Sequence, residues 1–467
     1  MKEPHGRNVT VSLQLAYAAP AFALALVGIP LYVYIPKFYT DVVGVHIGVL
    51  GGLILGIRLF DAVTDPLIGI LSDRTDTRFG RRRPYIFWGS LLLAVAIFCL
   101  FNPPDRPPTY ETAWFGFWFF SVFLFWTVVE VPYESLGPEI SFDYHERIGL
   151  FAWRDGALIA GTLVAAASPA LVSSLLGLST TPADEQAKFF WISVFYGPLV
   201  ILFSGWCVFA IRERARESAP ERPGLRKGLP AVLRNRPFLI LLFSYTIAAF
   251  GNNLPATLIL YYVEYVLHSR MADLFLGLYF MTGIFFLPGW VLLAKRIGKK
   301  RSWILSMAVN TGAFIGVFFL GPGDAAVYGV LVVLSGIGFG ATLAIPSAIQ
   351  ADVIDYDELL TGERREGQYI GLWSISKKLA AALGIGAGLS ILGLAGYTPN
   401  IEQSEQVRMT LRVLYALVPS LCNFIAILIA FRFPISSGIH RDILKGIEAR
   451  KNGIPVPNPL DPEEILE

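Results

Sequence analysis

Three ionisable residues lie in the middle of an otherwise apolar segment of this 467-residue chain. Arg58, Asp61 and Asp65 are spaced so that a helix would project all three side chains from one face. The segment around them, residues 45–72, is long and apolar enough to span a bilayer. A charged side chain at that depth costs roughly 2.5–3.5 kcal/mol on insertion scales. The cluster is therefore either an ion or solute site in a polar cavity or a structural link between helices, and the second acid favours a cation site.

Other ionisable groups interrupt later apolar segments. Glu130 and Glu134 are one helical turn apart, with Trp126 one turn before Glu130 and Thr127 beside that tryptophan. Trp126 would either stack on a sugar ring or pack against neighbouring helices, as most membrane aromatics do. Together these segments predict the following solute-binding side chains: Arg58, Trp126, Glu130, Glu134, Arg154 and Lys378.

The charges of this set do not cancel. Its four acids (Asp61, Asp65, Glu130 and Glu134) outnumber its three bases (Arg58, Arg154 and Lys378) by one, provided that Asp155 is left out. One bound Na⁺ or H⁺ would cancel the difference. Carboxylate and hydroxyl oxygens are hard ligands suitable for Na⁺, and a carboxylate pair can equally hold a proton. The sequence therefore predicts a coupling ion and no organic cofactor.

The composition is that of an integral membrane protein. Hydrophobic residues make up 54% of the chain and charged residues 16%, with a mean hydropathy of +0.56. A soluble protein would carry nearer one quarter charged residues. The sequence has no zinc-protease HExxH motif, no Walker-type phosphate loop and no nucleophile–base constellation, so we expect no enzyme activity. We expect a monomer whose partners are a small solute, a coupling cation and the lipid bilayer, with no nucleic acid.

The apolar segments predict an all-α fold of twelve transmembrane helices in two six-helix halves. They lie near 13–36, 45–72, 84–102, 113–135, 149–175, 188–211, 237–265, 272–294, 302–321, 325–347, 367–394 and 413–433. Arg and Lys concentrate in alternate loops, so the positive-inside rule places both termini in the cytoplasm of a cell (inner) membrane. The predicted organisation is a bundle at 1–211, a basic linker at 212–236, a second bundle at 237–433 and a cytoplasmic tail at 434–467.

The two halves echo one another in sequence. The turn after the second segment is basic, and a weaker copy, residues 294–301, follows the eighth segment. This pattern favours a parallel duplication in which a central site alternates its exposure. We expect the first turn to act in conformational gating through Asp73, Arg74, Gly80, Arg81, Arg82 and Arg83. Clusters of glycine, such as Gly336, Gly338 and Gly340, would serve either close packing or hinge motion.

Four motifs carry a family resemblance. They are Phe38-Tyr39-Thr40-Asp41-Val42-Val43-Gly44, Arg58-x-x-Asp61-x-x-x-Asp65-Pro66, Asp73-Arg74 to Arg83-Pro84-Tyr85, and Thr361-Gly362-x-Arg364-x-Glu366-Gly367. With them the chain resembles the glycoside–pentoside–hexuronide:cation symporter family (melibiose-permease-like) of the major facilitator superfamily, from the first span to the last. The resemblance implies cation-coupled uptake by alternating access. It also implies that Asp61 and Asp65 ligate Na⁺ or H⁺ with oxygens from Thr127 and Thr64, and that Glu130 touches both cation and sugar.

The chain departs from the family pattern at two positions. Ala25 stands where the family has a sugar-binding aspartate in span one, and Glu134 stands where it has a tryptophan in span four. Cation coupling therefore carries over better than sugar recognition. We expect a cation-coupled symporter for a glycoside, sugar or uronide, and the alternative is a cation-coupled lysophospholipid transporter of the same fold.

Overall fold

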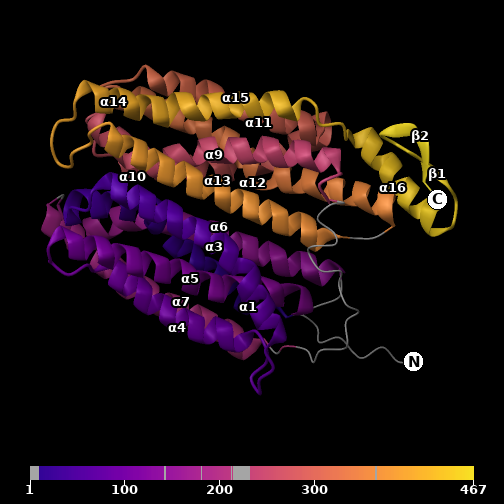
Figure 1. The fold of residues 1–467 in the computed structure, drawn as a ribbon, viewed down its shortest axis with the longest axis horizontal. Coiled ribbons are helices and arrows are strands. Elements are labelled where there is room, and N and C mark those ends of the chain that lie inside the picture. The colour runs from indigo at the N-terminus through magenta and orange to yellow at the C-terminus, as the bar shows by residue number, and fades with distance from the viewer. Residues whose placement is uncertain are drawn as a thin grey trace.

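Twelve long helical segments form two bundles that lie side by side in the computed structural model (Figure 1). The structure describes residues 10–140, 144–179, 181–211, 213, 232–362 and 365–466. The first bundle consists of a continuous segment α1 (Val11–Ile29), η1 (Pro30–Tyr34), α2 (Ile35–Phe38) and η2 (Tyr39–Val43), then α3 (Ile47–Arg74), α4 (Arg83–Phe101), α5 (Pro108–Ile140), α6 (Tyr144–Leu176) and α7 (Pro182–Ala210).

The second bundle follows residues 214–231, which lie outside the described part of the chain. It consists of α9 (Arg236–Tyr265), α10 (Ala272–Ile297), α11 (Lys299–Phe318), α12 (Ala325–Thr361), α13 (Glu366–Leu394) and a final segment formed by α14 (Glu405–Arg412), η3 (Val413–Leu417) and α15 (Val418–Ala430). A tail of α16 (Ser437–Lys451), β1 (Val456–Asn458) and β2 (Asp461–Leu466) completes the described chain.

The predicted spans are confirmed as helices. Within the described residues, eleven helices are long and apolar enough to cross a membrane. α11, which opens on Lys299, Lys300 and Arg301, completes the twelve. Several helices begin at a side chain that satisfies a free N–H group of the first turn: His46 accepts from Gly48, and Asn235 accepts from Phe238. The tenth segment is longer than predicted, because α12 continues past residue 347 to Thr361.

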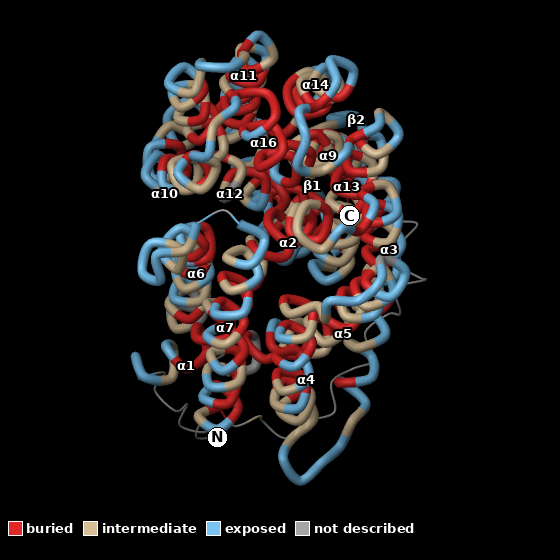
Figure 2. Tube along the Cα trace, turned by 90° about the vertical axis from the view of Figure 1, so that its left-hand side faces the viewer, coloured by how far each residue is buried: buried red, intermediate tan, exposed pale blue. Residues whose placement is uncertain are grey.

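The two bundles are built alike. In the first, helices pack as α1 with α6 and α7, α4 with α5 and α7, and α3 with α5. The corresponding pairs recur in the second, as α9 with α13 and α15, α11 with α12 and α15, and α10 with α12. The end-on view shows most helices of the second bundle above those of the first, with α3 beside α13 where the two meet (Figure 2). This repeated packing agrees with the duplication inferred from the sequence.

Most of the glycine clusters serve close packing. A Cβ at Gly340 would lie 2.4 Å from the Gly283 carbonyl oxygen, and one at Gly161 would lie 2.5 Å from the Phe22 carbonyl oxygen. Such distances exclude any larger residue without movement of the backbone. Gly156 differs, since a Cβ there would meet no atom within 4 Å.

The halves meet chiefly where α3 crosses α13 and where α6 approaches α10. The α3–α13 crossing is tight near the start of α3, where a Cβ at Gly51 would lie 2.8 Å from the Ser390 backbone nitrogen. We call the end of the molecule that carries α16 and the β strands the α16 end (Figure 1). The end formed by η2, the start of α3 and the chain between α13 and α14 is called the opposite end.

Candidate cation and solute site

The predicted acid pair on α3 is assembled with a hydroxyl group from α5. The Thr127 Oγ1 atom lies 2.8 Å from Asp61 Oδ1 and 3.0 Å from Asp65 Oδ1. Asp61 is 2% exposed and Thr127 is 1% exposed. The i, i+4 spacing of the aspartates brings both carboxylates to the face of α3 that packs on α5. Two carboxylates and a hydroxyl group thus converge midway along the helices. Their oxygen atoms are suitable ligands for a hard cation, and a carboxylate pair can also hold a proton.

Basic groups occupy the same cluster. The Nη1 atom of Arg58 donates to Asp61 Oδ2 at 2.9 Å. The Lys378 Nζ atom, from α13 in the other half, lies 3.3 Å from Asp61 Oδ2 and also forms an ion pair with Asp65. Two acids therefore face two bases in this conformation. A coupling cation would have to replace the Lys378 ammonium group at the aspartate oxygens.

Arg58 is held in place by aromatic rings as well as by Asp61. Its guanidinium carbon lies 4.4 Å from the centroid of the Phe123 ring and 5.2 Å from that of Tyr32. Contacts of this kind stabilise a desolvated guanidinium group. With 6% of its surface exposed, Arg58 is enclosed by these partners. The structure therefore favours a positioning role for Arg58 over the predicted contact with solute.

Two predicted side chains do not join the cluster. The Thr64 hydroxyl is buried and donates to the backbone carbonyl of Asp61 at 3.0 Å, as threonines inside helices often do. Trp126 is half-buried and packs toward α1, where a Cβ at Gly28 would lie 3.8 Å from its ring. Because Thr127 faces Asp61, its neighbour Trp126 is turned about 100° away around the helix axis. The packing alternative for Trp126 fits this geometry better than sugar stacking.

The acids of α5 continue the charged surface toward the α16 end. Glu130 is half-buried and interacts electrostatically with Asp65, Lys378 and Glu134. Glu134 is exposed and lies within electrostatic range of Arg154. Among the described residues, neither glutamate forms a salt bridge with a basic side chain. These two acids are therefore the accessible hydrogen-bond acceptors of the site.

The structure also fixes the direction of Asp155. Its Oδ1 atom accepts hydrogen bonds from Arg154 Nε at 2.9 Å and Arg154 Nη2 at 2.7 Å. The Arg154 guanidinium carbon lies 4.9 Å from the Phe151 ring centroid. Asp155 therefore has to be added to the count of acidic side chains in the site, from which it was excluded when its direction was unknown.

The basic turn after α3 is an internal anchor at the α16 end. Arg82 is buried and donates to Asp73 Oδ1 at 2.7 Å and to the Ser135 carbonyl at the end of α5. In the second half, Lys299 takes the equivalent place: it donates to the Ala348 carbonyl and to Asp352, both within the C-terminal part of α12. The two turns, which are similar in sequence, therefore make similar contacts: each donates to the fourth helix of its own half.

Glu213 has a structural role that no sequence motif predicted. Its carboxylate accepts the backbone N–H groups of Arg81, Arg82 and Arg83 at 2.7–2.9 Å. Gly80, with a φ of 104°, turns the chain so that these three donors converge at the start of α4. Arg83 Nε also donates to the Val208 carbonyl. The predicted gating residue Arg74 lies exposed at the end of α3.

A polar network at the opposite end joins the two halves. Asp41 accepts from the Tyr397 hydroxyl at 2.6 Å and from the Tyr265 hydroxyl at 3.1 Å, and its backbone carbonyl accepts from Asn400 at 2.6 Å. Lys37 pairs with Asp41 in its own half and with Glu264 Oε2 at 2.6 Å in the other.

Two further contacts extend this network: the Tyr34 hydroxyl donates to Asp273, and Thr40 bonds to Tyr261. We call the set formed by Lys37, Asp41, Glu264, Tyr265, Tyr397 and Asn400 the opposite-end latch.

Polar contacts between the halves are distributed unevenly. They occur at the opposite-end latch and at Lys378, midway along the helices. At the α16 end, the ion pairs found among the described residues stay within one half: Arg82 with Asp73, Arg365 with Asp357 and Lys299 with Asp352 are examples. The molecule is thus fastened at the opposite end and at its middle. Arg364, in the fourth sequence motif, lies outside the described residues.

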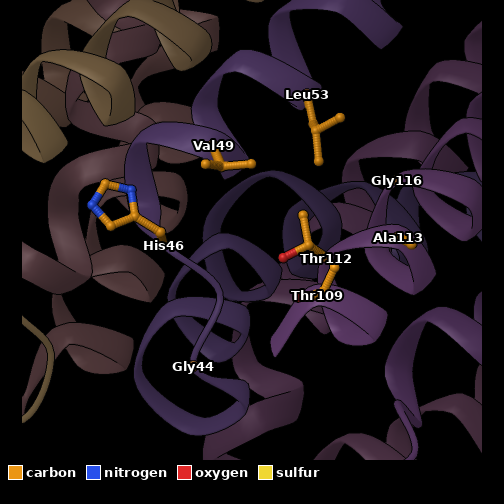
Figure 3. Close-up of a pocket in the computed structure, with 8 residues that line it drawn as sticks. All are labelled: Gly44, His46, Val49, Leu53, Thr109, Thr112, Ala113 and Gly116. Carbon is orange, nitrogen blue, oxygen red and sulfur yellow. The ribbon is translucent and has the colours of Figure 1, made fainter. Parts of the chain in front are cut away.

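A separate pocket lies away from this cluster. It has a volume of ≈ 620 Å³ and lies between the start of α3 and the start of α5 at the opposite end (Figure 3). Val49 and Leu53 line one side, and Thr109, Thr112 and Ala113 line the other. None of the predicted site residues lines this pocket, and its lining offers no charged group. It is therefore distinct from the candidate site.

Comparison with known proteins defines the class. The family model described as MFS/sugar transport protein matches residues 16–437. The chain is 28% identical to the isoprimeverose transporter of Lactiplantibacillus pentosus over 427 residues, covering 89% of this chain and 87% of that protein. It is 27% identical to the glucuronide carrier protein homolog of Escherichia coli (strain K12) over 452 residues, covering 94% of this chain and 95% of that protein.

Solved transporters share the fold. A bacterial homolog of the human lysosomal transporter Spinster superimposes with a TM-score of 0.65 at 14% identity, covering 96% of this chain and 99% of that one. The E. coli fucose:proton symporter FucP superimposes with a TM-score of 0.56 at 13% identity, covering 91% of this chain and 98% of that one. The fold is therefore that of a major facilitator superfamily transporter.

These findings confirm the class predicted from sequence: the protein is a multi-pass membrane transporter of the sugar type and not an enzyme. The chain belongs to the MFS/sugar transport protein family, among the glycoside–pentoside–hexuronide:cation symporters. The lysophospholipid alternative finds no support in the relatives' names, which refer to sugars, glycosides and related solutes.

Proposed function

We propose that this protein couples the inward movement of Na⁺ or H⁺ to the uptake of a glycoside, sugar or uronide by alternating access. The observation that carries the proposal is the meeting of Asp61, Asp65 and Thr127 from one half with Lys378 from the other. The carboxylates and the hydroxyl can bind a cation, and Lys378 competes for the same oxygens. Similarity to a putative glycoside/cation symporter supports the coupling.

The mechanism follows from that competition. When the halves part at the opposite end, Lys378 moves with α13 and the aspartates of α3 lose a positive partner. A cation that binds there replaces the lost charge, and its binding favours solute binding in the same cavity. In the conformation described here, Lys378 is returned to the aspartates and would displace the cation. Coupling is then a difference in cation affinity between two states of one site.

The orientation also belongs to this proposal. The α16 end carries Arg81, Arg82 and Arg83 in the first half and Lys299, Lys300 and Arg301 in the second. By the positive-inside rule this end faces the cytoplasm, with both termini there, and the protein lies in the cell (inner) membrane. The latch then closes the outer face, and the described conformation is inward-facing. Asp73, Arg74, Gly80 and the three arginines would keep the inner ends of α3, α4 and α5 moving as one body.

The test is gradient-driven uptake into proteoliposomes. Asp61→Asn and Asp65→Asn should each abolish accumulation driven by a Na⁺ or H⁺ gradient, because an amide cannot balance the charge of the bound ion. Asp461→Asn, an exposed change in β2, is the matched control and should leave accumulation unaltered. Equal accumulation by all three variants would refute the assignment of the cation site.

A further inference from the structure

Glu134 differs from the other acids of the cavity region in its surroundings. Asp61 and Asp65 are paired with Arg58 and Lys378, and Asp155 is paired with Arg154. Glu134 is exposed and, among the described residues, forms no salt bridge or hydrogen bond. Glu130, one helical turn away, is half-buried and likewise forms no salt bridge or hydrogen bond among the described residues. The two carboxylates are adjacent on one face of α5 and are free to accept hydrogen bonds from a solute.

Most bases of the region pair with acids other than Glu130 and Glu134. Arg58 is enclosed by Asp61, Phe123 and Tyr32. The Nε and Nη2 atoms of Arg154 are directed at Asp155, and the same guanidinium group interacts electrostatically with Glu134. Lys378 contacts both aspartates of α3. Lys377 is exposed, but it interacts electrostatically with Glu130. A carboxylate or sulfonate group of a solute would therefore meet two glutamates without an ion pair, and the bases nearest to them, Lys377 and Arg154, already interact electrostatically with Glu130 and Glu134.

The charge balance leads to the same conclusion. With Asp155 and Lys377 included, five carboxylates (Asp61, Asp65, Glu130, Glu134 and Asp155) face four basic groups (Arg58, Arg154, Lys377 and Lys378). The remaining negative charge is cancelled by one coupling cation. A neutral solute leaves the loaded site balanced, whereas an anionic solute adds an uncompensated charge inside the membrane. The occupied site is therefore electrically neutral when it holds one cation and one neutral solute.

We propose that Glu134 is a specificity-determining residue that excludes anionic solutes, so that the transported solute is a neutral polyhydroxylated glycoside. Its hydroxyl groups donate to Glu130 and Glu134, since ionised carboxylates are acceptors only and bind hydroxyl donors strongly. This inference rests on the proposed function and narrows it: uronides and sulfonated sugars are rejected at the α5 surface by like charge.

Binding to the purified full-length protein tests the inference with matched probes. Methyl glucoside, methyl galactoside and methyl xyloside are compared with methyl glucuronide and methyl galacturonide by ligand-induced thermal stabilisation, with and without Na⁺ and at two pH values. The wild-type protein should bind at least one neutral probe and neither acid. Glu134→Gln should raise the ratio of acid to neutral affinity by about tenfold or more, because the repelling charge is removed while the shape is kept.

Glu402→Gln is the control, since the side chain of Glu402 is 79% exposed at the opposite end. Tight binding of either acid by the wild-type protein, or an unchanged acid-to-neutral ratio in Glu134→Gln, would overturn the inference. Acid binding that depends on Na⁺ or pH would overturn it while leaving the proposed symport intact. Neutral binding that is indifferent to both ions would support the charge selectivity and count against the coupling. Failure of all five probes to bind would overturn both.

Discussion

The Lys378 Nζ atom lies 3.3 Å from the Oδ2 atom of Asp61, although α13 and α3 belong to different halves of the molecule. The lysine also contacts Asp65, so one ammonium group from the second half supplies one of the two positive charges, with Arg58, that balance the acid pair of the first. An ion pair that crosses between two moving bodies has a different strength in each arrangement of those bodies. In the proposed mechanism this contact links cation binding to the conformation of the transporter.

Lys378→Gln should make stability depend on the coupling ion. Removing one partner of a buried ion pair typically destabilises a protein by about 3–5 kcal/mol, because the other charge remains buried and unpaired. We expect the melting temperature of Lys378→Gln to fall in Na⁺-free buffer at alkaline pH and to recover with added Na⁺ or on acidification. Lys445→Gln, on the exposed face of α16, is the control. Equal ion dependence in both variants and the wild-type protein would show that Lys378 does not compete for the cation site.

The opposite-end latch should be weakened by loss of one hydroxyl group. Burial and the neighbouring Asp41 carboxylate raise the pKa of Tyr397 well above its usual value, so its hydroxyl stays protonated and donates to Asp41. Tyr397→Phe should shift the population toward the state open at this end by about tenfold or more, since a hydrogen bond to a charged group contributes about 1.5–3 kcal/mol.

Spin labels at Thr109 and Ile401, both exposed at the opposite end on different halves, would report the shift as a longer distance population. Tyr110→Phe is the matched control, because Tyr110 is 49% exposed at the same end. If the two tyrosine variants gave the same distance distribution as the wild-type protein, the latch would have no part in closing this face.

The sequence was sufficient for the local part of the site. The i, i+4 spacing predicts that Asp61 and Asp65 share one face of a helix, which depends only on residues a few positions apart. In the structure both carboxylates lie beside Thr127, a residue that only the family resemblance had implied. The twelve spans were predictable for a related reason: the hydrocarbon core fixes their length and polarity.

Contacts between distant segments could not be predicted in this way. Lys378 was predicted to bind solute, whereas its partners in this structure are Asp61 and Asp65, and these depend on how the halves are docked. Glu213 forms its three backbone hydrogen bonds because Gly80 takes a positive φ and the chain returns there after α7. Asp41 belongs to the family motif at residues 38–44, but its partners Tyr265 and Tyr397 come from the other half. The i, i+4 spacing of Lys37 and Asp41 in an apolar segment was the one signal available.

Glu213→Gln should slow turnover without changing selectivity. The carboxylate gathers three N–H groups at the start of α4, and an amide oxygen would hold them less strongly. We expect a loss of roughly 1–3 kcal/mol in stability and a lower maximal uptake rate with an unchanged order of solute preference. Arg78→Gln, an exposed change in the same turn, controls for charge in the loop. A changed solute order in Glu213→Gln would contradict a purely structural role for this turn.

Two adjacent glycines of α3 offer a matched test of the crossing between the halves. A Cβ at Gly51 would lie 2.8 Å from the Ser390 backbone nitrogen and 3.0 Å from the Gly386 carbonyl oxygen, whereas one at Gly52 would meet no atom within 4 Å. Gly51→Val should therefore push α3 away from α13 at the opposite end, lengthen the Thr109–Ile401 label distance and lower uptake. Gly52→Val should preserve both, since it replaces the same residue type on an open face of the same helix turn. Equal behaviour of the two variants would mean that α3 and α13 do not approach closely there during transport, and the alternating contact between the halves would have to lie elsewhere.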